Sequence, residues 1–77
     1  MTAQELETMY ENKRRFVEKL SEALIMIERF GLSEIVYSRR DNHEIIEITF
    51  KDGFRRNLDV TGDSEYAIIL DIHRTLG

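Results

Sequence analysis

The hydrophobic period of this chain changes at Gly31, and that change limits the folds open to it. Before Gly31, apolar residues recur every three or four positions, as on one face of a helix. They are Leu6, Met9, Tyr10, Phe16, Val17, Leu20, Ala23, Leu24, Ile27 and Phe30. After Gly31, short runs rich in β-branched and aromatic residues are typical of strands. The pattern therefore predicts a helix followed by a sheet.

The first helix has a start signal and a stop signal. Thr2-Ala3-Gln4-Glu5 matches a capping box, whose two end side chains satisfy free groups of the first turn. Gly31 supplies the left-handed residue that commonly ends a helix. We expect a helix over Ala3–Phe30, with Lys13 interrupting a nearly heptad apolar seam.

Three strands are expected after Gly31, at Ile35–Tyr37, Ile45–Phe50 and Phe54–Val60, with turns at Asp41-Asn42 and Asp52-Gly53. A two-residue loop at the second turn would set the apolar residues of one strand beside the polar residues of the next. A three-residue loop, with Gly53 left-handed in a bulge, avoids this mismatch. We therefore predict a loop over residues 51–53, which pairs Phe50 with Phe54 and Ile46 with Leu58.

This register divides the sheet into two faces. The apolar face carries Ile46, Ile48, Phe50, Phe54, Leu58 and Val60. The opposite face carries His43, Ile45, Glu47, Thr49, Arg55, Asn57 and Asp59. Arg56 falls on the apolar face and must therefore reach an edge or a carboxylate.

A short amphipathic helix is expected at the end of the chain. Asp63 or Ser64 is its N-cap, and its apolar residues are Ile68, Ile69, Ile72 and Leu76, before Gly77. The predicted fold class is α+β, in one domain over residues 1–77. A long N-terminal helix, a three-stranded antiparallel meander and a short C-terminal helix follow in order, with both helices on one sheet face.

A set of residues in the second half of the chain carries a resemblance. Ile48-Thr49-Phe50, Asp59-Val60-Thr61-Gly62-Asp63-Ser64, Ile69 and Asp71-Ile72 resemble short uncharacterised proteins encoded on bacterial phages and mobile elements. The resemblance covers roughly residues 43–76 and implies a genetic context, with no catalytic residue to carry over.

Composition favours some classes of protein over others. There is no cysteine to form a disulfide or a thiolate metal site, and no long apolar run for a signal peptide or a membrane span. We therefore expect a cytoplasmic protein without membrane contact. The formal net charge of −4 disfavours nucleic acid as a partner.

No pattern of catalytic or cofactor-binding residues is found. The two histidines, His43 and His73, are far apart in sequence, and the glycines are isolated rather than grouped into a phosphate-binding loop. We expect no enzyme activity, no cofactor and no metal.

Three surfaces remain as candidates for a partner. Arg39, Arg40, Arg55 and Arg56, with the cluster Lys13-Arg14-Arg15, would form a basic patch if they converged. Acidic residues crowd both helices and could imitate a nucleic-acid backbone; they are Glu5, Glu7, Glu11, Glu18, Glu22, Glu28, Asp63, Glu65 and Asp71. Tyr37, Ile45 and Thr49 would form an apolar spot on the open sheet face, unless Tyr37 faces the core.

The difference in length between the first helix and the strands predicts a dimer. A helix over Ala3–Phe30 would be about 42 Å long, against about 23 Å for a seven-residue strand. Its overhang would expose Leu6, Met9, Tyr10 and Phe16, which a second copy of the chain would cover.

The leading hypothesis is a small, non-enzymatic protein-interaction module that forms a homodimer. The first alternative is a phage-encoded inhibitor, of the anti-defence or anti-CRISPR type, whose acidic surface blocks a nucleic-acid-binding protein. The second alternative is a weak nucleic-acid binder that uses the arginine pairs.

Overall fold

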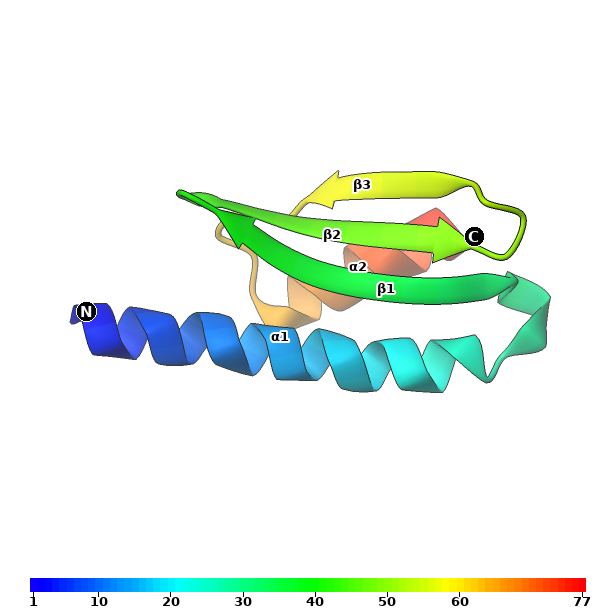
Figure 1. The fold of residues 1–77 in the computed structure, drawn as a ribbon. Coiled ribbons are helices and arrows are strands. Elements are labelled where there is room, and N and C mark those ends of the chain that lie inside the picture. Colours follow the sequence, from blue (N-terminus) through cyan, green and yellow to red (C-terminus); the bar gives the residue numbers. More distant parts are fainter.

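A three-stranded antiparallel sheet lies against two helices in the structure, a computed structural model that describes all residues, 1–77. The elements in order are α1 (Ala3–Ile25), the 3-10 helix η1 (Glu28–Phe30), β1 (Leu32–Arg40), β2 (His43–Phe50), β3 (Arg55–Asp59) and α2 (Glu65–Leu76). The strand order is β1-β2-β3, and both helices cover the same face of the sheet (Figure 1). The α+β class and the element order are therefore confirmed.

Helix α1 begins as predicted and ends early. The Thr2 hydroxyl accepts from the Glu5 amide at 3.1 Å and donates to the Glu5 carboxylate. The prediction that the helix continues to Phe30 is wrong, because α1 ends at Ile25 and Ile27 is extended. Gly31 is left-handed, with φ 61°, but it caps η1 instead of α1.

The early end of α1 allows Phe30 to reach the core. Phe30 packs against the core and lines a small apolar cavity with Leu20 and Leu24. In a continuous helix, Phe30 would lie six positions after Leu24 and about 240° around the axis. Tertiary packing therefore overrides the helical pattern of the sequence at this point.

The register predicted for β2 and β3 is confirmed. Ile46 pairs with Leu58, and the Phe50 amide donates to the Phe54 carbonyl at 2.8 Å across the three-residue loop. Gly53 is left-handed in this loop, with φ 90°. Arg56 is exposed on the edge strand β3, as its position on the apolar face required.

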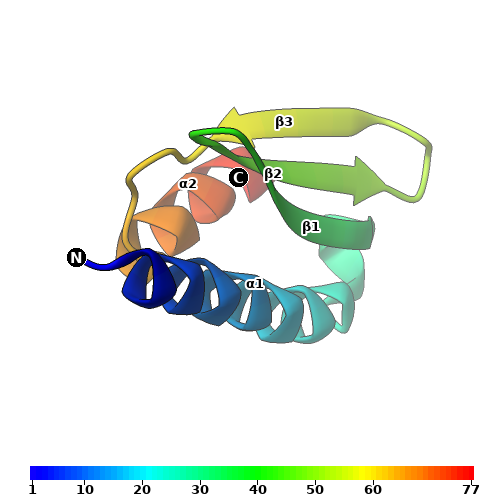
Figure 2. The same cartoon turned by 60° about the vertical axis from the view of Figure 1, so that its left-hand side comes forward.

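Nine buried apolar side chains form the core between the sheet and the helices. They are Val17, Leu32, Ile35, Tyr37, Ile46, Ile48, Val60, Ile68 and Ile72. Helix α2 is capped by Ser64, whose hydroxyl accepts from the Ala67 amide at 3.2 Å. The view in Figure 2 shows α1 beneath β1 and α2 beside it on the same side of the sheet.

The overhang of the first helix is smaller than predicted, because the helix is shorter and the hairpin longer than expected, but the first turns of α1 still extend beyond the tip of the hairpin (Figure 1). The 23 residues of α1 span about 35 Å, and the nine residues of β1 span about 30 Å. The four residues assigned to a dimer interface, Leu6, Met9, Tyr10 and Phe16, are half-buried within one chain. Tyr10 and Phe16 pack against the core, so the chain itself covers much of this stripe.

Candidate functional site

A buried ionic network joins α1, both strands of the first hairpin and the turn before α2. The Lys13 ammonium lies 2.8 Å from Oε1 of Glu44, and the two side chains are 4% and 3% exposed. The Tyr37 hydroxyl donates to the same oxygen at 2.7 Å, and the Gly62 amide donates to Oε2 at 2.8 Å. Both carboxylate oxygens of Glu44 are therefore used inside the chain.

The network shifts the pKa values of Glu44 and Tyr37 and of a carboxyl beside them. Burial raises the pKa of the Glu44 carboxyl, but hydrogen bonds from Lys13, Gly62 and Tyr37 outweigh it, so the pKa lies below its ordinary value. Burial and the hydrogen bond to Glu44 raise the pKa of the Tyr37 hydroxyl. Burial and a hydrogen bond shared with Asp71 raise the pKa of the nearby Asp63 carboxyl.

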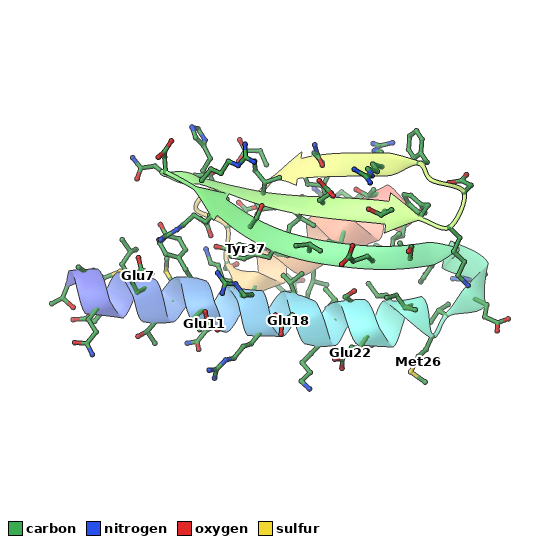
Figure 3. The ribbon with its side chains drawn as sticks, in the orientation of Figure 1. Glu7, Glu11, Glu18, Glu22, Met26 and Tyr37 are labelled. Atoms are coloured by element: carbon green, nitrogen blue, oxygen red, sulfur yellow. The ribbon has the colours of Figure 1, made fainter.

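A groove of about 620 Å³ runs beside this network, between α1 and β1. Its lining residues are Arg14, Glu18, Ser21, Glu22, Glu34, Ile35, Val36, Tyr37, Ser38 and Arg39. Figure 3 shows Glu18 and Glu22 on the flank of α1, with Tyr37 on β1 above them. One wall of the groove is therefore a helix flank and the other is the free edge of a strand.

Some backbone amides and carbonyls of β1 face this groove. Strand β1 is an edge of the sheet, and the Ile35 amide donates away from β2, to Oγ of Ser21 at 3.1 Å. Because backbone direction alternates along an antiparallel strand, the amides and carbonyls of Tyr37 and Arg39 point the same way. Outside the strand pairs, no hydrogen bond in the chain uses these groups.

The backbone hydrogen bonds of Glu44 lead independently to the same orientation for the backbone of Arg39. Its amide donates to Thr61, and its carbonyl accepts from the Val60 amide, so its backbone faces β3. Glu44 lies opposite Arg39 in the hairpin. The backbone of Arg39 is therefore not bonded to β2 and faces the groove.

The basic side chains of the groove are paired, and most of its carboxylates are not. Arg39 binds Glu7 at 2.9 Å, its guanidinium lies 4.1 Å from the ring centre of Tyr10, and the bond to Glu7 raises its pKa. Arg14 binds Glu11 at 3.2 Å outside the groove. Three acids remain: Glu18 and Glu34 make no ion pair, and Glu22 has only a long, exposed contact of 3.9 Å with Lys19.

The structure does not bring the predicted basic patch together. Arg39 and Arg40 lie at the tip of the first hairpin, where they pair with Glu44 and His43. Arg55 pairs with Thr49, five residues along β2 from Glu44, or about 17 Å away, and Arg56 is the next residue of β3. Lys13, from the third basic cluster, is buried against Glu44. The two arginine pairs therefore lie at opposite ends of the sheet.

The other candidate surfaces also change in the structure. Tyr37 is 5% exposed and faces the core, which confirms the alternative stated for it and leaves Ile45, Thr49 and the exposed Val36 on the open face. On the acidic flank of α1, Glu7 and Glu11 are neutralised by their ion pairs with arginines. The structure groups no three His, Asp or Glu side chains as a metal site requires.

Sequence reasoning missed both the buried network and the groove. Lys13 within an apolar seam was the available signal for the first, because a buried ammonium needs a carboxylate partner. The partner, Glu44, lies just before the predicted strand Ile45–Phe50 and carries no signal of burial in the sequence, but it lies in β2 and is 2% exposed.

Comparison with models of protein families, with curated proteins and with solved structures found no match. The resemblance to phage-encoded proteins therefore stays a prediction. None of the helices combines the length and the apolar character needed to cross a membrane.

Proposed function

We propose that the chain is a non-enzymatic protein-interaction module that binds an extended segment of another protein as a fourth strand beside β1. One observation carries this proposal: the backbone groups of Tyr37 and Arg39 open on a groove of about 620 Å³. Strand addition uses such groups for affinity and uses neighbouring side chains for specificity. Residues 35–39 of β1 span about 17 Å, which suits a guest of five to seven residues.

A second copy of the chain is a poor guest for this groove. Helix α1 runs along β1 in every copy (Figures 1 and 2), so a second β1 would bring a second α1 into the same space. A homodimer through Leu6, Met9, Tyr10 and Phe16 would use another part of α1 and stays a prediction. Sedimentation of the protein as a monomer at tens of micromolar would contradict that dimer.

The test compares two substitutions at Arg39. Both Arg39→Ala and Arg39→Pro remove the contacts of the side chain with Glu7 and Tyr10, but only proline removes the amide that faces the groove. Random eight-residue peptides selected by display against the wild-type protein are then measured on both variants. We expect binding to Arg39→Pro to be at least about tenfold weaker than to Arg39→Ala, because one backbone bond is lost and the ring obstructs the guest.

Circular dichroism must show that both variants are folded. Equal binding to the two variants would contradict strand addition at β1. Failure to select any peptide would contradict the proposed function as a whole.

A further inference from the structure

We infer that the guest strand is cationic, with lysine or arginine at every second position and β-branched residues between them. This inference rests on the proposed function, because it names the chemistry of the segment that would lie beside β1. The preference has two sources, which are the unpaired charges of the groove and the alternation of side chains along a strand.

The charges of the groove are unbalanced once internal pairs are counted. The positive charges of Arg14 and Arg39 are compensated by Glu11 and Glu7, which lie outside the groove lining. The carboxylates of Glu18, Glu22 and Glu34 lack a close basic partner. All three residues are exposed. A cationic guest would supply the missing partners, and a carboxylate-bearing guest would meet like charge.

Strand geometry determines where the cations of the guest must lie. Side chains of an added strand point alternately to the two faces of the sheet. On the helix side they meet the flank of α1, where Glu18 and Glu22 lie. On the open side they lie beside Glu34 and Val36, which is 39% exposed. Cations facing α1 and β-branched residues beside Val36 therefore fit both walls.

Three labelled peptides of one length separate charge from backbone pairing. They are Thr-Lys-Val-Lys-Val-Lys-Thr, the same peptide with glutamate for lysine, and the lysine peptide whose central lysine carries a methyl group on its backbone nitrogen, which keeps the charge and removes the amide donor. Fluorescence anisotropy gives the Kd of each for the wild-type protein at low salt. We expect the lysine peptide to bind at least about tenfold more tightly than either of the others.

Two double variants test which carboxylates of the protein attract the lysine peptide. Glu18→Gln with Glu22→Gln removes the two groove carboxylates on the flank of α1 and should weaken binding of the lysine peptide about tenfold. Glu5→Gln with Glu28→Gln removes the same charge outside the groove lining and should leave the Kd unchanged. Glutamine at position 5 remains compatible with the capping box.

Each outcome decides the inference. Equal affinity for the lysine and glutamate peptides, with both weakened by Arg39→Pro, would overturn the cationic preference and leave the groove as the site. An equal loss in the two double variants would mean that net charge alone attracts the peptide, which also overturns it. Absence of lysine-peptide binding at millimolar concentration would overturn it as well, and the display selection would then decide separately whether the groove binds other segments.

Discussion

The two edges of the sheet are protected in different ways, and the difference indicates where a partner would bind. Strand β3 has five residues, begins with the exposed Arg55 and Arg56, and ends where Asp59 accepts from the Thr61 amide at 3.0 Å. Short length and charge are the usual means of preventing a sheet edge from pairing. Strand β1 has nine residues, and its central part has neither protection.

At the edge formed by β1, helix α1 gives the protection that short length and charge give at β3. Ser21 satisfies the Ile35 amide, while the groove leaves the backbone groups of Tyr37 and Arg39 open. Under the proposed function, this arrangement would let a long edge strand accept a peptide while the helix beside it limits aggregation.

The largest expected effect comes from removing the Lys13 ammonium from the buried ionic network. Lys13→Met leaves the Glu44 carboxylate buried without its cation, and we expect a loss of about 3–5 kcal/mol in the free energy of unfolding. Adding Glu44→Gln removes the uncompensated charge and should recover part of that loss. Urea denaturation measures both effects, with the exposed Lys19→Met as control. A Lys13→Met variant as stable as wild type would show that the network does not secure the hairpin.

Adjacent prolines on β1 test which way its amides point. The Ser38 amide faces β2, so Ser38→Pro removes a ladder hydrogen bond and should cost about 2–3 kcal/mol. The Arg39 amide faces the groove, so Arg39→Pro should cost about 1 kcal/mol more than Arg39→Ala, chiefly through backbone strain. Denaturation midpoints in urea give the comparison. The reverse order would mean that Tyr37 and Arg39 are bonded to β2 and that no edge groups are free.

The register of the opposite edge depends on Gly53. Gly53→Val should cost at least about 1 kcal/mol, because φ is 90° there and a β-branched residue is strained at positive φ. No atom lies within 4 Å of the added Cβ, so the cost is conformational and not a clash. An unchanged denaturation midpoint would contradict the role of Gly53 in fixing β3.

Local sequence patterns predicted the caps and turns of this fold more accurately than they predicted its tertiary contacts. The capping box at Thr2, the three-residue loop and the Ser64 cap each depend on a few neighbouring residues, and all three appear in the structure. The end of α1 depends on where Phe30 packs, which is a tertiary contact. Periodicity alone therefore extended the helix too far.

The candidate site was harder to predict because it joins segments that are distant in sequence. Lys13 and Glu44 are 31 residues apart, and neither carries a local motif that names the other. The groove also depends on which backbone groups remain unpaired at the sheet edge. That orientation follows from the full hairpin register over Leu32–Phe50, whereas the sequence indicated only three residues of β1.

The smallest effect concerns Asp63, which borders the network that holds β1. Its pKa is raised above the ordinary value of 3.8 by burial and by Asp71, so ionisation of Asp63 makes the folded state less stable at neutral pH. Asp63→Asn cannot ionise and should be more stable than wild type at neutral pH. This gain should disappear as pH falls through the raised pKa and then below 3.8, where the wild-type carboxyl is protonated in both states. Glu44 acts in the opposite direction, because its pKa is lowered and its contribution to stability is lost on acidification.

Chemical denaturation of wild type and Asp63→Asn from neutral pH to about pH 3 isolates the effect of Asp63, since Glu44 is common to both proteins. Glu28→Gln in η1 controls for net charge. A difference between Asp63→Asn and wild type that is constant with pH would show that Asp63 does not ionise as described.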